Sequence, residues 1–340
     1  MFPQQRVVQG TEIRWLPAGR ATPETLGSVP SVHAAWNGSY SLSLDGHATL
    51  KLEDEVFVAL NAGHVLTARG RPDPSACLLS IYFAPELLQK ALEALPAAER
   101  DLLIAGSHNG PFRLFEHVRD SDRSLASVLR YIAHHMSTGS DDPQWYEEQV
   151  SFLLRRLLGH EVSLARTAEA LTHMKSWKRR ETFVRIARVT DLIHSCYERA
   201  LAIDELAAAA HWSRFHMMRE FKEVHGISPY EFLQRRRTQT ASRLLCTTDL
   251  SVAEIAERTG FHVRTLMRRL HRSRGLGARA LRTQYSLVES GRGPFDSAGK
   301  RRDFSRLPHE ETQSQHSTSP RMTTSVVSHI ETATSISSVR

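Results

Sequence analysis

The sequence contains 340 residues, of which 41% are hydrophobic and 24% charged, and its formal net charge is +7. This length allows two domains with a sizeable core, and the positive charge favours an acidic partner without deciding between nucleic acid and a membrane surface. The sequence shows no stretch of about 18 consecutive apolar residues and no apolar N-terminal signal segment, which argues against a membrane protein.

The positive charge is concentrated in one part of the chain. Residues 201–282 hold 15 Lys and Arg against 8 Asp and Glu, a net charge of +7, so the other 258 residues sum to zero. A basic domain joined to a neutral one is the pattern of a nucleic-acid-binding protein with a separate module. Cys77, Cys196 and Cys246 are far apart and include no CxxC pair, which argues against a disulfide framework and predicts a cytoplasmic location.

The first half of the chain predicts a β-rich region followed by helices. Residues 1–25 are polar and proline-containing and are expected to form a loosely held start. From residue 31 to 83, short apolar runs such as Tyr40–Leu44 and Glu55–Leu60 are separated by turn signals, which predicts a small β-sandwich or barrel. From Pro85 the apolar spacing becomes helical, with helices predicted at Glu86–Leu95, Leu125–His135 and Trp145–Leu158.

These patterns divide the chain into predicted parts and give an α+β fold class. Residues 26–165 are one domain, residues 166–181 a basic polar linker, and residues 182–285 a second, helical domain that begins with a long helix at Thr182–Tyr197. Residues 286–340 contain 12 Ser and 6 Thr with almost no apolar periodicity, so we expect a disordered tail.

Two helix-turn-helix units are predicted in the second domain. In the first unit, Ile203–Ala210 is a short helix of small residues, and Ser213 is an N-cap candidate for the next helix, Arg214–Val224. Met217 and Phe221 recur at i, i+4 and are expected to pack inward. The opposite face presents Arg214, Phe215, Met218, Arg219 and Lys222.

The second unit repeats this arrangement. Ser251–Arg258 is the first helix, and Ser251 with Glu254 matches a capping box. The next helix, Val263–Arg274, carries Leu266 and Leu270 on its packing face. The rest of its surface is crowded with arginines, namely Arg264, Arg268, Arg269, Arg272 and Arg274.

A connecting helix is predicted between the two units. Gly226 ends the preceding helix, Ser228-Pro229 begins the connector, and Tyr230–Leu245 continues without interruption. Sixteen residues of helix span roughly 24 Å, which suits two recognition helices about one DNA turn, roughly 34 Å, apart. Arg235, Arg236 and Arg237 are interpreted as solvated, salt-bridged or packing residues of this connector.

The stretch Leu201–Arg282 resembles the DNA-binding domain of the AraC/XylS family of transcription regulators. The segments that carry the resemblance are LAIDELAAAAHWSRFHMMREFKEVHGISPYEFLQRRRTQTASRLL and DLSVAEIAERTGF. It implies a C-terminal all-α domain of two helix-turn-helix units joined by a long helix, and an N-terminal cupin-like β-barrel with following helices for sensing or dimerisation. The chain departs from the family at Leu270, usually an aromatic residue, at Ala278, usually a proline, and in a turn after Phe261 that is one residue short.

The resemblance also implies which residues contact DNA. The base-reading positions fall on Phe215, Met218 and Arg219 in the first unit and on Val263, Arg264 and Arg268 in the second. Arg219 and Arg264 are best suited to guanine edges, which accept two hydrogen bonds from a guanidinium. Arg214, Lys222 and Arg269 are interpreted as phosphate contacts. Phe215 and Met218 have a competing interpretation as incidental exposed apolar residues.

The predicted partners follow from this interpretation. They are double-stranded DNA, a small-molecule effector of the N-terminal domain, RNA polymerase, and a second copy of the chain through the helices at Leu125–His135 or Trp145–Leu158. No cofactor, metal or catalytic residue is predicted. The alternative is an enzyme or carbohydrate-binding module in the β-rich half; it would need a ligand cluster around His33, His47, His64 or His108, yet no HxH pair, GxSxG elbow or phosphate-binding loop occurs.

Overall fold

The computed structural model describes residues 4–17, 25–45, 48–54, 56–70, 76–105, 112–139, 142–171 and 175–274. His47, His108, Ala278 and the predicted tail of residues 286–340 lie outside the described residues. Among the helices that are described, none combines the length and the apolar character that crossing a bilayer requires.

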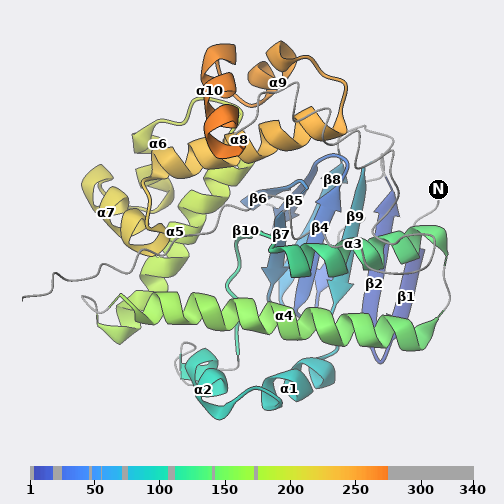
Figure 1. The fold of residues 1–340 in the computed structure, drawn as a ribbon. Helices are drawn as coiled ribbons and strands as arrows, with labels where there is room; N and C mark the ends of the chain where they lie inside the picture. The colour runs from blue at the N-terminus through green and yellow to red at the C-terminus, as the bar shows by residue number, and fades with distance from the viewer. Residues whose placement is uncertain are drawn as a thin grey trace, which may run out of the picture. The chain divides into compact units, whose positions relative to one another are not determined.

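Six antiparallel strands form the larger of two sheets (Figure 1), in the order β1-β2-β9-β4-β7-β10. Their bounds are β1 Gln4–Val8, β2 Thr11–Pro17, β4 Ser31–Trp36, β7 Val56–Leu60, β9 Cys77–Tyr82 and β10 Val118–Asp120. The expectation of a loosely held start is therefore wrong for residues 4–17. Thr11, Ile13 and Trp15 alternate into the core, and Pro17 only ends its strand, where a proline is tolerated.

The second sheet has four strands in the order β3-β8-β5-β6, with bounds β3 Thr25–Gly27, β5 Tyr40–Leu44, β6 Ala48–Leu52 and β8 His64–Gly70. Leu42, Leu52 and Leu66 of this sheet share an apolar core with Val58 and Leu78 of the larger one. Among the described strands no pairing joins the two sheets, so the strands form a sandwich rather than a closed barrel.

Helices cover the other face of the larger sheet. Their bounds are α1 Pro85–Glu93, α2 Ala97–Ala105, α3 Arg123–Thr138 and α4 Pro143–Glu169. Leu129 of α3 and Leu153 of α4 pack in one cluster with Trp15, Phe57 and Ile81 of the sheet. The helices predicted in this region are present, but the third extends well past the predicted end at Leu158, because Val162 and Ala165 continue its buried face.

The remaining described helices form the C-terminal part, with bounds α5 Ser176–Cys196, α6 Ile203–Ala209, α7 Arg214–His225, α8 Pro229–Thr247, α9 Val252–Arg258 and α10 Val263–Arg274. The segment predicted as a linker, residues 166–181, contains the end of α4 and the start of α5. Two small apolar cores lie here, one around Met217 and Phe221 and one around Leu266 and Leu270. The fold thus combines an N-terminal sheet region with a helical C-terminal region, as predicted.

A histidine is buried on the face of the larger sheet that points toward the smaller one. Both ring nitrogens of His33 are hydrogen-bonded, Nε2 with Ser31 Oγ at 2.9 Å and Nδ1 with Ser80 Oγ at 2.8 Å. Burial, assisted by the charge of Arg14, lowers the pKa of His33 to about 3. The imidazole is therefore neutral in the folded protein above about pH 3.

This histidine makes stability depend on pH. Below about pH 6.5 the unfolded chain binds a proton at His33 that the folded chain does not, so stability is lost as the pH falls from about 6.5 toward the folded pKa, by about 1.4 kcal/mol per pH unit. We expect His33→Gln to remove about 2–3 kcal/mol of the stability difference between pH 7 and pH 4.5, measured by urea unfolding at both values. His271→Gln, on an exposed residue of α10, is the control; equal pH dependence in both variants contradicts the assignment.

Candidate nucleic-acid interface

The first helix-turn-helix unit is built from α6 and α7. The turn between them places His211 in the left-handed region, with φ of 53°. Ser213 then caps α7, because its side chain accepts a hydrogen bond from the backbone N–H of His216 at 3.3 Å. Gly226, with φ of 72°, ends the helix in a left-handed conformation. The predicted start of this helix and both predicted capping residues are confirmed.

The two faces of α7 differ as predicted. Met217 and Phe221 are fully buried in the core that they share with α6. On the outer face, the Phe215 side chain is 74% exposed, and Met218, Arg219 and Lys222 are also exposed. A phenylalanine that is this open to solvent has no role in the core, so it is available to a partner.

Two arginines of this unit are engaged in ion pairs. Arg214 pairs with Asp204 of α6 through both Nε and a terminal nitrogen. Arg219 donates two hydrogen bonds to Oε1 of Glu220, at 2.9 and 2.6 Å. Glu220 is fully buried, whereas the Arg219 side chain is 58% exposed. A buried carboxylate therefore holds the Arg219 guanidinium at the protein surface.

The second unit is built from α9 and α10. Ser251 and Glu254 form a capping box at the start of α9, as predicted. Gly260, with φ of 67°, makes the turn. Leu266 and Leu270 of α10 are buried, so the leucine at the position usually occupied by an aromatic residue packs as a core side chain.

The outer face of α10 carries a stripe of exposed arginines. Arg264, Arg268 and Arg272 are exposed and recur at i, i+4, and none of the three forms an ion pair with another described residue. Arg269, by contrast, points toward α8 and lies 3.5 Å from Glu231. Like charges at i, i+4 destabilise a free helix, so this stripe is suited to a polyanionic partner.

The connector α8 contacts α7, α9 and α10 (Figure 1). Its three consecutive arginines have different environments: Arg235 is exposed, while Arg236 and Arg237 are buried. Arg236 lies 3.3 Å from Glu53 of the N-terminal region. Arg237 donates hydrogen bonds to the carbonyl oxygens of Tyr197 at 2.7 Å, Arg199 at 2.8 Å and Gly260 at 2.7 Å. It therefore joins the end of α5 to the turn of the second unit.

Comparison with known sequences also indicates a helix-turn-helix domain. A sequence model of the helix-turn-helix domain family matches residues 206–284. The HTH-type transcriptional regulator MtrA of Neisseria gonorrhoeae is 26% identical over 258 residues, which cover 71% of this chain and 82% of MtrA. Residues 206–284 form an AraC-type helix-turn-helix domain, and the chain is similar to transcription regulators of the AraC family.

Two solved structures are similar to the AraC-type domain. The DNA-binding domain of AdpA in complex with a target DNA is 31% identical, with a TM-score of 0.30, and the similarity covers 31% of this chain and 96% of that domain. A probable AraC family transcriptional regulator from Rhodopseudomonas palustris is 24% identical, with a TM-score of 0.28, and the similarity covers 30% of this chain and 96% of that protein.

Some features of this AraC-type domain were not predicted from its sequence. Met267 and Tyr230 are exposed apolar side chains that the sequence analysis did not name as candidates. The helical spacing of Val263, Met267 and His271 could have placed Met267 on the outer face of α10. The hydrogen bonds from Arg237 to three carbonyl groups could not be predicted from the local sequence, because the partner residues lie 23 to 40 residues away along the chain.

The Arg237 contacts leave no room for a side chain at the turn of the second unit. A Cβ atom on Gly260 would lie 2.3 Å from the Glu198 carbonyl oxygen and 2.9 Å from Arg237 Cζ. We expect Gly260→Ala to lower the free energy of unfolding by about 3 kcal/mol or more, since it adds a clash to backbone strain, as measured by chemical denaturation.

Gly226→Ala is the matched control. Gly226 also has a positive φ, of 72°, but no other group lies within 4 Å of the position that a Cβ atom would take there. The substitution should lower the free energy of unfolding only by the cost of placing an alanine in the left-handed conformation, about 1–2 kcal/mol. Equal losses in the two variants would show that the close approach of the Glu198 carbonyl and the Arg237 guanidinium does not constrain Gly260.

Proposed function

We propose that α7 and α10 enter two successive segments of one DNA major groove and select an operator sequence. Phe215, Met218 and Arg219 contact bases in the first segment, and Val263, Arg264 and Arg268 in the second. Arg214, Lys222 and Arg269 contact phosphates. The observation that carries the proposal is the exposure of the six proposed base-contacting side chains on the outer faces of α7 and α10. The connector α8, with 19 residues, spans about 28 Å, close to one turn of DNA.

The ion pairs of the free protein shape this binding. Arg219 must leave Glu220 to reach a guanine. Because the Glu220 carboxylate is fully buried, separating the pair costs more than the about 0–1 kcal/mol of an exposed ion pair, and the bidentate base contact has to offset that cost. Arg214 and Arg269 likewise exchange Asp204 and Glu231 for phosphate oxygens. Arg264 and Arg268 form no ion pair with a described residue, so neither has to break one before it contacts DNA.

Replacing Arg219 and Lys222 separates base reading from phosphate contact. We expect Arg219→Ala to weaken operator binding by about 1–3 kcal/mol and to relax selection at one base pair. Lys222→Ala should weaken binding to all sequences alike and lower the slope of log K against log salt by about 1. Affinities for an operator and single-base variants, measured at several salt concentrations, test both. Unchanged selection in Arg219→Ala would place the reading face elsewhere.

The arginine stripe of α10 should oppose stability and support binding. We expect the triple substitution Arg264→Gln, Arg268→Gln and Arg272→Gln to raise the free energy of unfolding by about 0.5 kcal/mol, because two like-charged i, i+4 pairs are removed. The same variant should lose DNA affinity at low salt by more than tenfold.

The control removes the same charge elsewhere. Arg130, Arg155 and Arg156 are exposed on α3 and α4, and their replacement by glutamine should leave DNA affinity nearly unchanged. If both triple variants bind DNA equally weakly, net charge rather than the α10 stripe governs binding.

The N-terminal region is proposed as a sensing module of the cupin-like type that modulates DNA binding in response to a small molecule. The similarity to MtrA supports this role, since it extends far beyond the helix-turn-helix residues. A homodimer and contact with RNA polymerase remain predictions. Tyr131 of α3 and Phe152 of α4 are exposed and would lie in a dimer interface formed by these helices.

We infer a regulator rather than an enzyme. MtrA, the relative that matches most of the chain, is a transcription regulator by name. In the part of the chain that the structure describes, no group of three or more His, Cys, Asp or Glu is placed to hold a metal. His33, one of its candidate ligands, uses both ring nitrogens on serines.

A further inference from the structure

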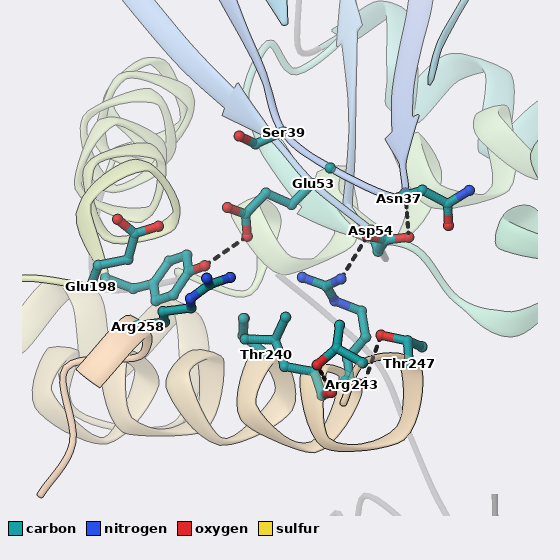
Figure 2. Close-up of a pocket in the computed structure, with 13 residues that line it drawn as sticks. Asn37, Ser39, Glu53, Asp54, Glu198, Thr240, Arg243, Thr247 and Arg258 are labelled. Atoms are coloured by element: carbon teal, nitrogen blue, oxygen red, sulfur yellow. Dashed lines mark hydrogen bonds and ion pairs between the residues drawn. The ribbon is translucent and has the colours of Figure 1, made fainter. Parts of the chain in front are cut away.

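A pocket of about 820 Å³ opens between the N-terminal strands and the DNA-binding helices. Figure 2 shows Glu53 and Asp54 entering from the sheet side, and Thr240, Arg243 and Arg258 from the helices α8 and α9. This volume lies within the range of small-molecule sites, about 300–1,000 Å³. Polar and apolar atoms share the accessible walls about equally, but most of the lining residues are polar or charged, so they can recognise a ligand by hydrogen bonds and charge.

The charges around the pocket do not balance. Three carboxylates are paired with three cations: Asp54 with Arg243 at 2.8 Å, Glu53 with Lys51 at 2.7 Å and Arg236 at 3.3 Å, and Glu198 with the same Lys51. Arg258 is left over, since it forms no ion pair with any described residue. The acid whose charge it feels is Glu254, on its own helix, which is already used in the capping box. Lys51 and Arg236 do not line the pocket, but they neutralise carboxylates that do, so Arg258 is the lining cation that remains without an ionic partner among the described residues.

Thr240 supplies a second, independent indication of a ligand. Its side chain lines the pocket and is only 3% exposed, and its hydroxyl has no hydrogen-bond partner among the described residues. A buried hydroxyl without a partner costs about 1–3 kcal/mol, and a ligand oxygen in the pocket would remove that cost.

The other hydroxyl groups of the pocket define what the ligand must offer. Tyr197 donates to Glu53 at 2.9 Å, Thr247 donates to the Arg243 carbonyl at 3.0 Å, and Thr248 donates to the Leu244 carbonyl at 2.6 Å. Each hydroxyl that already donates keeps only acceptor lone pairs. A ligand that satisfies them must itself carry donors, which hydroxyl groups provide.

We propose that this pocket binds a hydroxylated organic acid with one negative charge, of the sugar-acid class. The ligand carboxylate pairs with Arg258, one of its oxygens is hydrogen-bonded to Thr240, and its hydroxyls donate to the threonine and tyrosine oxygens. This proposal rests on the proposed function in one respect only, the role of the ligand as an effector.

The location explains how such a ligand would act. Arg258 is in the last turn of α9, the first helix of the second helix-turn-helix unit, and Thr240 is on the connector α8. The opposite wall belongs to the β-rich region. A bound acid would therefore change the position of the second unit relative to the N-terminal region.

Calorimetric titration of the full chain without DNA tests the binding. The probes are D-gluconate, sorbitol, which has the hydroxyls without the charge, and hexanoate, which has the charge without the hydroxyls. D-gluconate should bind at least tenfold more tightly than either of the others. Arg258→Gln should weaken gluconate binding at least tenfold and Thr240→Val at least threefold, whereas Arg69→Gln, on an exposed residue of β8, should have no effect.

The outcomes separate the site from its role. Gluconate that binds no more tightly than sorbitol or hexanoate, or equally well to the Arg258 variant, overturns the site. If gluconate binds as expected, it should change the operator Kd of the unmodified chain by fivefold or more; no change overturns the effector role and leaves the site intact. Since the titration contains no DNA, a failure of operator binding would not affect it.

Discussion

The arrangement of the two helix-turn-helix units depends on the Arg237 guanidinium. It is buried on α8 without a carboxylate partner among the described residues, and this desolvation lowers its pKa. Its charge is instead stabilised by three backbone carbonyl groups, from the end of α5, from the segment before α6, and from the turn between α9 and α10. A lysine ammonium also has three donors, but it lacks the planar fork that spaces the donors of a guanidinium toward three separate carbonyl groups. One side chain of the connector thus joins the segment that precedes the first unit to the turn of the second unit.

A second set of buried charges joins the same connector to the N-terminal region. Glu53 accepts from Tyr197 and pairs with Arg236 and Lys51, and Asp54 pairs with Arg243. Breaking one member of a buried network leaves an uncompensated charge, which costs about 3–5 kcal/mol. Separating the connector from the N-terminal region would therefore require these pairs to be broken together.

The sequence predicted the parts of the fold that are determined locally. The start of α7, the Ser213 cap, the capping box of α9 and the inward faces of α7 and α10 each follow from residues within one or two helical turns. The full length of α4, the strands in residues 4–17 and the partner of Arg236 could not be predicted in this way. From sequence, Arg236 is expected to be solvated, salt-bridged or packed in the connector, and its salt bridge is to Glu53, 183 residues away in sequence, so no local pattern could indicate that partner. The positions of the proposed base-contacting residues came from the family resemblance, and the structure adds their exposure.

The two units are electrostatically unlike, which suggests a division of work between them. In the first unit, Asp204 and Glu220 neutralise the arginines, so charge alone contributes little to DNA affinity there. Only a DNA site with better hydrogen-bond acceptors than Glu220 offsets the cost of separating Arg219 from that carboxylate. In the second unit the exposed arginines of α10 have no described acid to leave, so any phosphate backbone attracts them. The second unit would therefore supply most of the salt-dependent attraction and the first unit most of the discrimination. A ligand that repositions the second unit through Arg258 would then change how firmly the protein holds DNA more than which sequence it prefers.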